Sequence, residues 1–585
     1  MKVLTPQRAI WIRFTLAIAA GLCLSASFPK LSLAGLAWIA PGCLLFVALG
    51  QPGGQAFRVG FLAGLAHQLA TLHWLLFIPY PVGAVMGWLA LSAYLALWPG
   101  FWVWLCWRLF PNPPAANAGR AAAAKTDSTI QPFNDSTSPL GAWLTAAETF
   151  VSTTLWQRLG WTLFCAAAWV AMEMIVGRFL SGFPWNFLGV SQYQMLPLIQ
   201  IASVTGVYGV SFLVAWTSVS LACALLGVVR RPQWGWAWFS EVRLPLVAVV
   251  VVTVFGLRQV TQPVPAQREI RLALVQPSIP QTLIWDRAQS TNRFNKLLQL
   301  SELALVAKPD LLVWPEAAVP NLLRYSQHVH EAVTNLARTH RVWMIVGADD
   351  AEPRQRAKKA DDYDYFNSSF LINPDGEIVA TYRKQRLVIF GEYVPLARWL
   401  PFLHYLTPIE GGFTPGDRAA PFRVPALGVN IATLICFEDT FAHFVRGCVT
   451  DDTDFLLNLT NDAWFGESAE QWQHAATALF RAIENGLPLI RCTNNGLTCW
   501  IDARGRMHEV FFGDSPDIYG EGFKIARVPL PAAGSRPAPT FYRRHGDWFG
   551  WGCVAATALA ALVRLAENRH RPTGQNQRPP AEPEA

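Results

Sequence analysis

The stretch IATLICFEDT, residues 431–440, places a thiol at the end of an apolar run and two carboxylates almost directly after it. Residues 431–435 are typical of a buried strand, and Cys436 follows them. Such a cysteine has two interpretations. It is either a small hydrophobic residue that fills the core, or a nucleophile held at the end of a strand.

The segments around this stretch alternate between strands and helices, as in a globular α/β domain. The turn Pro-Asp-Gly marks a hairpin within residues 367–384. Because the strands are nearly continuous apolar runs, we expect helices to cover them in a layered sandwich. Strands are predicted at 269–277, 310–316, 342–350, 367–384, 428–439, 454–462 and 487–505, and helices near 288–307, 327–340 and 469–485.

Polar side chains stand where three of these strands end: Glu316, Lys384 and Cys436. Sites in α/β folds gather at strand ends. Together the three form a nucleophilic set: the carboxylate takes the thiol proton, the thiolate attacks a carbonyl carbon, and the ammonium stabilises the oxyanion. The pattern leaves structural roles open, since Glu316 could cap a segment and Lys384 could lie in a solvated basic turn.

The other half of the chain has the composition of a membrane protein. The chain is 52% hydrophobic and 15% charged, whereas soluble proteins carry about 25% charged residues. Residues 1–261 are mostly apolar, and a spanning helix needs roughly 20 such residues. We therefore predict eight transmembrane helices, at about 10–28, 31–49, 59–80, 85–109, 161–177, 207–229, 244–261 and 548–566.

The basic residues predict the orientation of these helices. Lys2, Arg8 and Arg13 precede the first span, and Arg/Lys residues recur in every second loop and in the tail after residue 566. Since such residues favour the cytoplasmic side, both termini are expected there. Seven spans before the globular part then place that part outside the cytoplasm. The net charge of +7 is explained by this topology, and no nucleic-acid-binding motif is present.

Several segments receive weaker interpretations. Residues 111–139 are rich in Pro, Ala and Ser and are expected to be disordered, and residues 140–156 could form an interfacial helix. Three polar residues lie inside a predicted span: His67, Gln68 and His73. Each has two interpretations, a functional role or a hydrogen bond between helices.

The cysteines and histidines indicate neither a disulfide framework nor a bound metal. The ten cysteines include no CxxC pair. The cysteines and histidines also lack ligand spacing, and no phosphate-binding glycine loop is present. We expect neither a metal nor an organic cofactor.

Eight motifs together resemble one family, apolipoprotein N-acyltransferase of the nitrilase superfamily, across nearly the whole chain. The resemblance implies an extracytoplasmic nitrilase-like αββα sandwich (an α+β membrane protein overall) with Glu316, Lys384 and Cys436 as its catalytic triad. The motifs are VWPEAAVP (313–320), YRKQRLVIFGEYVP (382–395), LICFEDT (434–440), NLTNDAWFG (458–466), RCTNNG (491–496), GFPWNFLG (182–189), GVYGVSFLV (206–214) and VQPSIPQTLIWD (275–286).

The resemblance also implies the reaction. An acyl chain would pass from a phospholipid, typically phosphatidylethanolamine, through a Cys436 thioester to the α-amine of a diacylglyceryl-cysteine in an apolipoprotein. This is the last step of lipoprotein maturation, carried out by ping-pong catalysis at the bacterial inner membrane. By family position Glu392 and Glu438 would support the site and Trp285 would line the substrate entrance. Phe437 departs from the family pattern, which often has tyrosine there.

Two further hypotheses follow from these assignments. Residues 396–413 are apolar and aromatic but interrupted by prolines, so with GFPWNFLG they could form a mobile lid at the membrane surface. The alternative function is a membrane-anchored amidohydrolase with the same triad and a small soluble substrate. We expect three regions: a transmembrane domain at 1–261, a periplasmic nitrilase-like domain at 262–547, and a final helix with a cytoplasmic tail at 548–585.

Overall fold

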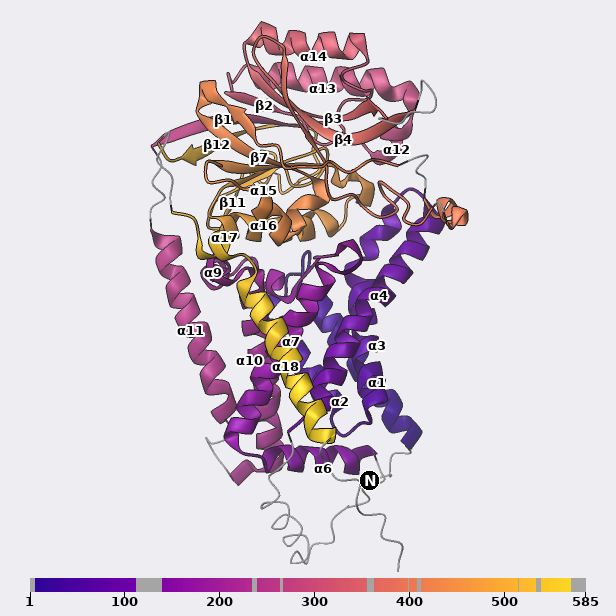
Figure 1. Cartoon of the computed structure of the whole chain (residues 1–585), viewed down its shortest axis with the longest axis vertical. Coiled ribbons are helices and arrows are strands. Elements are labelled where there is room, and N and C mark those ends of the chain that lie inside the picture. Colours follow the sequence, from indigo (N-terminus) through magenta and orange to yellow (C-terminus); the bar gives the residue numbers. More distant parts are fainter. Residues whose placement is uncertain are drawn as a thin grey trace, which may run out of the picture.

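The chain folds into a bundle of long helices and a two-sheet domain that stands on one end of the bundle (Figure 1). The computed structural model describes residues 6–111, 139–233, 239–262, 267–354, 362–397, 399–407, 412–513, 515–532 and 538–569. Most of the segment 111–139, expected to be disordered, lies outside these residues. The first residue of α1 and the last residues of α18 lie at the end of the bundle away from the two-sheet domain (Figure 1).

The bundle is built from apolar helices. Among the described residues, six helices are long and apolar enough to cross a membrane. They are α1 (Pro6–Ala26), α4 (Pro81–Arg108), α7 (Leu155–Val176), α10 (Val207–Arg230), α11 (Ser240–Thr261) and α18 (Trp548–Arg569).

The two remaining predicted spans form shorter elements. The segment 31–49 becomes the 3-10 turn η1 (Ala34–Trp38) followed by α2 (Ala40–Ala48), and 59–80 becomes α3 (Gly53–Thr71) followed by η2 (His73–Phe77). His67 lies on α3, buried, with its Nδ1 3.1 Å from the Ser25 hydroxyl of α1. His67 therefore makes a contact between two helices, which is one of the two roles expected for it from the sequence.

Short elements close the two ends of the bundle. α6 (Pro139–Val151) lies across the end away from the two-sheet domain, as an interfacial helix would (Figure 1). At the other end the chain is irregular and then forms short helical turns. These are η3 (Phe179–Ser181), η4 (Leu188–Gln192), α8 (Leu196–Ile199) and α9 (Ala202–Thr205).

The first sheet has six strands in the order β12-β1-β2-β3-β4-β5. β1, β2 and β3 are parallel, and the other neighbours are antiparallel. Its strands are β1 (Arg268–Gln276), β2 (Leu311–Val313), β3 (Trp343–Pro353), β4 (Tyr363–Ile372), β5 (Ile378–Arg383) and β12 (Gly522–Leu530).

The second sheet also has six strands, in the order β11-β10-β9-β8-β7-β6. β7, β8 and β9 are parallel. Its strands are β6 (Phe422–Val424), β7 (Val429–Ile435), β8 (Phe455–Thr460), β9 (Leu489–Thr493), β10 (Cys499–Ile501) and β11 (Met507–His508).

Helices cover both outer faces, which gives four layers. α13 (Ser290–Leu305) and α14 (Gln327–His340) lie on the first sheet, and α15 (Ala442–Cys448) and α16 (Glu470–Asn485) lie on the second (Figure 1). Apolar side chains of the two sheets pack between them, including Leu272, Ile431 and Leu457. A strand covered on both faces needs apolar residues throughout, which explains why β7 does not alternate.

The layer of α15 and α16 rests on the bundle. One hydrophobic cluster contains both Phe480 of α16 and Val210 of α10. Smaller elements connect the layers: α12 (Gln281–Trp285), η6 (Arg287–Gln289), η7 (Pro401–Leu406), η8 (Pro425–Leu427), η9 (Cys436–Thr440), η10 (Asp462–Phe465) and α17 (Phe541–His545). The strand ends of the second sheet therefore lie near the junction of the two parts of the molecule.

Candidate active site

Glu316 and Lys384 meet as a buried ion pair. Glu316 follows β2 and Lys384 follows β5, and Lys384 Nζ lies 3.1 Å from Glu316 Oε1. The close approach depends on Gly347 of β3, because a Cβ there would lie 2.0 Å from the carbonyl oxygen of Pro315. Both side chains are almost fully buried, so their attraction is little screened by solvent.

Glu392 completes this cluster. Its Oε1 lies 2.8 Å from Lys384 Nζ, and its Oε2 accepts the backbone N–H of Val388 at 2.8 Å. Burial by itself lowers the pKa of Lys384, but the two carboxylates Glu316 and Glu392 outweigh burial and raise this pKa well above its usual value. The lysine is therefore a permanent cation between two acids.

Cys436 begins η9, directly after β7, with a left-handed backbone (φ +54°). This conformation is unusual for a residue with a side chain and is found at functional sites. Asn458 of β8 donates a hydrogen bond to the Cys436 carbonyl oxygen at 3.1 Å. The sharp turn, supported by Asn458, separates the thiol from the apolar strand before it.

The electrostatic surroundings of Cys436 connect it to the ion pair. Burial raises the pKa of the thiol well above its usual value, the charge of Glu316 adds to this, and the charge of Lys384 offsets part of it. The resting group is therefore a thiol. A thiolate forms only when a base takes the proton, and Glu316 is the carboxylate that interacts with it most strongly.

Glu438 is buried and accepts hydrogen bonds mainly from the backbone. Its carboxylate accepts the N–H groups of Gln385 (2.7 Å), Arg386 (3.1 Å) and Ile435 (2.8 Å), and the Tyr382 hydroxyl (2.7 Å). Burial raises the pKa of Glu438 to about 7, although these hydrogen bonds oppose the rise. Glu438 thus joins the turn after Lys384 to the turn at Cys436.

Trp285 lies on α12. Its side chain is 40% exposed, and its ring packs edge-on against Trp464, with centroids 5.3 Å apart. Trp464 belongs to η10, which follows β8. Trp285 is therefore placed near a strand end of the second sheet, and the structure gives it no hydrogen bond to the triad among the described residues.

Phe437 connects the site to the bundle. Its ring lies 5.9 Å from that of Phe183 and 6.4 Å from that of Trp185, both in the irregular segment after α7. An aromatic ring fills this position without needing a hydroxyl group. The segment GFPWNFLG is buried from Trp185 to Leu188, so this half of the proposed lid is packed into the junction.

Asn367 and Asp349 were not found from the sequence. Asn367 Nδ2 donates to Glu316 Oε1 at 2.7 Å and to Glu392 Oε1 at 2.9 Å, which holds the two carboxylates around the lysine. Asp349 is its partner across β3 and β4. The sequence could have indicated Asn367 and Asp349 only through the alternation of side chains along paired strands. Using this alternation requires the register in which β3 pairs with β4, which the sequence does not give.

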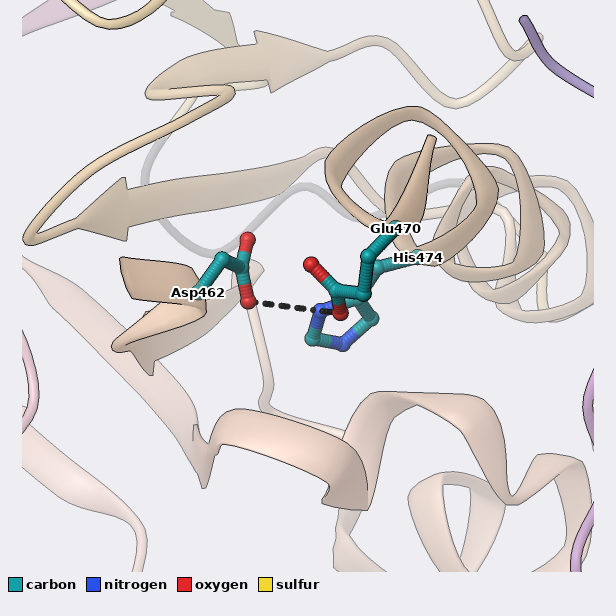
Figure 2. A group of neighbouring side chains, drawn as sticks. All are labelled: Asp462, Glu470 and His474. Atoms are coloured by element: carbon teal, nitrogen blue, oxygen red, sulfur yellow. Dashed lines mark hydrogen bonds and ion pairs between the residues drawn. The ribbon is translucent and has the colours of Figure 1, made fainter. Parts of the chain in front are cut away.

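Asp462, Glu470 and His474 form a second buried cluster (Figure 2). The imidazole of His474 lies between two carboxylates, with Nε2 2.8 Å from Asp439 Oδ1 and Nδ1 3.0 Å from Asp462 Oδ1. Glu470 lies 3.6 Å from Nδ1, and Arg491 pairs with Asp439. All of these side chains are buried.

The charges in this cluster balance without a metal ion. Ligand atoms of Asp462, Glu470 and His474 lie within 4.8 Å of one another, which is a spacing that a metal could use. Both imidazole nitrogens, however, already face carboxylates, so both act as donors and the ring is a cation. With Arg491 it offsets Asp439 and Asp462. Burial and the charge of Asp462 raise the pKa of Glu470 well above its usual value, so Glu470 adds no charge, and we interpret the cluster as an ion network.

Comparison with known proteins agrees with both halves of this structure. The family model of carbon-nitrogen hydrolase matches residues 271–512, which hold the sandwich except for β12 and the first residues of β1, and include every strand end described above. The sandwich is therefore a carbon-nitrogen hydrolase domain, a class of enzymes that typically uses a cysteine nucleophile.

The bundle narrows this class to one family. The model of the apolipoprotein N-acyltransferase N-terminal domain matches residues 20–125 and 137–220. The apolipoprotein N-acyltransferase of Geobacter metallireducens is 33% identical over 94% of this chain and 95% of its own length. That of Vibrio cholerae serotype O1 is 32% identical over 81% of this chain and 83% of its own. The chain belongs to the apolipoprotein N-acyltransferase family.

Proposed function

We propose that this acyltransferase moves an acyl chain from a phospholipid to the α-amine of a diacylglyceryl-cysteine in an apolipoprotein, through a thioester on Cys436. The observation that carries this proposal is the buried ion pair of Glu316 with Lys384, whose charges both act on the Cys436 thiol. A carboxylate and an ammonium next to a nucleophile supply the base and the oxyanion donor that acyl transfer needs.

In the first half-reaction Glu316 takes the thiol proton, and the Cys436 sulfur attacks the carbonyl carbon of the sn-1 ester. Lys384 stabilises the negative charge that develops on the carbonyl oxygen. The carbon–oxygen bond then breaks, the proton passes from Glu316 to the leaving oxygen, and the lysophospholipid departs. The acyl chain remains as a thioester.

In the second half-reaction the apolipoprotein amine attacks the thioester carbon. Glu316 accepts a proton from the amine as the new carbon–nitrogen bond forms, and the sulfur leaves and recovers that proton. Glu392 and Asn367 keep Lys384 and Glu316 in place, and Glu438 fixes the two turns that carry Lys384 and Cys436. Trp285 is proposed to line the entrance.

The arrangement of the two halves supports a lipid substrate. Phe437 shares an aromatic cluster with Phe183 and Trp185 of the bundle, and Trp185 helps to line a cavity of about 80 Å³ among mainly apolar side chains. A soluble amide would need neither feature. We propose phosphatidylethanolamine as the usual donor, since this is what the family resemblance implies.

The chain is a multi-pass protein of the bacterial inner membrane, and we propose that its sandwich is periplasmic. Eight spans would place both termini on one side of the membrane, which the basic residues predict to be the cytoplasm, and the start of α1 and the end of α18 do share one end of the bundle (Figure 1). The proposed boundaries are 1–261 for the transmembrane domain, 262–547 for the periplasmic domain and 548–585 for the last helix and tail.

Mass spectrometry of the trapped acyl-enzyme tests the function. After incubation with phosphatidylethanolamine vesicles, we expect a long-chain thioester on the peptide that contains Cys436. Glu316→Gln and Lys384→Met should each slow its formation by about 10²- to 10³-fold, because each removes a group that acts in the transition state.

Cys448→Ala is the matched control, since Cys448 is a buried cysteine of neighbouring α15, and the adduct should persist in it. A small acyl group on Cys436, with no long-chain adduct, would favour the amidohydrolase. A long-chain adduct on another cysteine would contradict the assignment of Cys436.

A further inference from the structure

Thr460 stands beside the nucleophile at the end of the neighbouring strand. β7 and β8 run parallel with Ile435 opposite Leu459, so the residues that follow, Cys436 and Thr460, are neighbours. The Thr460 hydroxyl donates a hydrogen bond to Asp462 Oδ1 at 3.1 Å, and its interaction with the Cys436 side chain lowers the pKa of the thiol, against the larger effect of burial. A hydroxyl has a single hydrogen to donate, so it serves either the sulfur or the carboxylate.

Asp462 does not depend on Thr460 for its hydrogen bonds. The His474 ring donates to the same Oδ1 at 3.0 Å, and Arg491 lies 3.5 Å from the other oxygen. His474 is a charged donor, and hydrogen bonds from charged donors are roughly twice as strong as neutral ones. Arg491 contributes its charge but no hydrogen bond, since neither its Nη2 nor Asp462 Oδ2 has a hydrogen-bond partner among the described residues. Asp462 Oδ1 therefore keeps a charged donor when the hydroxyl turns away.

We propose that Thr460 is a positioning residue for the nucleophile, whose hydroxyl donates to Asp462 while Cys436 is a thiol and to the sulfur once Cys436 is a thiolate. This inference rests on the proposed function of Cys436. The thiol proton goes to Glu316, the Thr460 O–H bond only rotates, and Asp462 keeps the His474 hydrogen bond. No covalent bond of Thr460 breaks.

His474 acts on Cys436 through two hydrogen-bonded aspartates, Asp462 and Asp439. Its hydrogen bond to Asp462 allows the Thr460 hydroxyl to turn from Asp462 to the Cys436 sulfur. Through Asp439, which also pairs with Asn458, it holds the side chain that donates to the Cys436 carbonyl oxygen. The network thus connects His474 of α16 to Thr460 through Asp462 and to Asn458 through Asp439.

The charges around His474 favour its cationic form. Burial by itself lowers the pKa of His474, and Arg491 lowers it further, but Asp439 and Asp462 raise it to about 10. Burial and the charge of Asp462 raise the pKa of Glu470 well above its usual value, so Glu470 is neutral. The ring of Trp185, 5.5 Å away, covers the imidazole from the bundle side.

The alkylation rate of Cys436 as a function of pH tests this proposal, because iodoacetamide reacts with the thiolate. The rate is read by mass spectrometry of the Cys436 peptide in the full chain in detergent micelles, from pH 6 to 10. We expect Thr460→Val to react about tenfold more slowly than the natural protein at pH 7, with its curve displaced to higher pH. Thr460→Ser keeps the hydroxyl and should stay within about twofold.

Thr493→Val is the matched control. Thr493 is a buried threonine opposite Thr460 on β9, and its hydroxyl bonds to Gln276 and Thr498. Its alkylation curve should match that of the natural protein even if its thermal stability falls. Thr460→Ala, which removes the same hydroxyl, replaces Thr460→Val if the latter fails to fold.

Replacing His474 by Gln completes the test. His474→Gln alone should slow the alkylation of Cys436. The double variant of His474→Gln and Thr460→Val should slow alkylation by less than the product of the two single effects, because His474 acts partly through Thr460. A Thr460→Val protein that folds and shows the natural alkylation curve would overturn the proposal. Because alkylation needs no lipid, this result is independent of the long-chain adduct that tests the acyltransferase.

Discussion

At the scale of single residues, the site holds one more acid than the proposed mechanism uses. Asp349 is paired with Asn367 across β3 and β4, whereas the next residue on β3, Asp350, accepts a hydrogen bond from Arg383. Burial and the nearby charges of Glu316 and Glu392 raise the pKa of Asp349 to about 7. Its Oδ1 finds no hydrogen-bond donor among the described residues.

Asp349→Asn should therefore stabilise the protein at pH 8. A carboxyl whose folded pKa lies above its unfolded value near 3.9 favours folding at low pH, and that contribution is lost as the pH rises through about 7. We expect a gain of about 1–3 kcal/mol in the free energy of unfolding at pH 8, shrinking towards pH 4. Thermal unfolding at both pH values measures it.

The exposed Asp375, which pairs with Arg341, supplies the control for this prediction. Asp375→Asn should leave the pH dependence unchanged, because an exposed ion pair contributes little. Equal unfolding curves for Asp349→Asn and the natural protein at both pH values would show that Asp349 ionises as freely when folded as when unfolded.

At the scale of elements, α16 joins the sandwich to the bundle. It is buried on nearly all sides because the second sheet lies on one face and the bundle on the other. Gln473 Oε1 accepts from Trp74 (3.1 Å), Trp185 (2.9 Å) and Asn186 (3.0 Å), and its Nε2 donates to two backbone carbonyls of the bundle. One amide thus satisfies five buried polar groups.

Replacing Gln473 by Leu should destabilise this junction strongly. The change leaves buried donors and acceptors without partners, each at about 1–3 kcal/mol, so we expect a loss of about 3 kcal/mol or more. The midpoint of thermal unfolding in detergent measures it. Gln327→Leu, on an exposed face of α14, is the control with an unchanged midpoint, and a similar midpoint for both variants would count against the role of Gln473.

At the scale of the whole molecule, exposed aromatic side chains gather beside the bundle. In residues 399–405, Trp399 and Tyr405 are each 79% exposed and Phe402 is 58% exposed. The Tyr80 hydroxyl, at the start of α4, donates to the Tyr405 carbonyl oxygen at 2.9 Å. Such a patch fits a lipid surface, so the lid hypothesis now applies to this segment alone.

Replacing Trp399 and Tyr405 together by Ala should raise thioester hydrolysis relative to transfer to an apolipoprotein peptide. The reason is that a closed, apolar lid keeps water from the thioester. The measurement is the ratio of free fatty acid to acylated peptide. Trp156→Ala is the control, because Trp156 is equally exposed (79%) on α7. An unchanged ratio in the double variant would remove the lid from the mechanism.

Most of the elements were predictable because they depend on local patterns. The strand predicted at 454–462 is β8, and the helix near 469–485 is α16, since an apolar run or a helical period is visible in the residues themselves. β12 was not predicted, because its residues alternate weakly and it forms only by pairing with β1 over nine residues. The structure divides each of the predicted spans 31–49 and 59–80 into an α-helix and a short 3-10 turn.

From the sequence alone follow the division into an apolar half and a globular half, the strand ends that carry Glu316, Lys384 and Cys436, and the family to which the motifs belong. The tertiary structure alone decided how distant strands pair. That pairing brings Asn367 and Asp349 to the ion pair, Thr460 to the thiol, and His474 between two aspartates. These contacts join residues far apart in the chain, and a buried charge is stable only where folding supplies its partner.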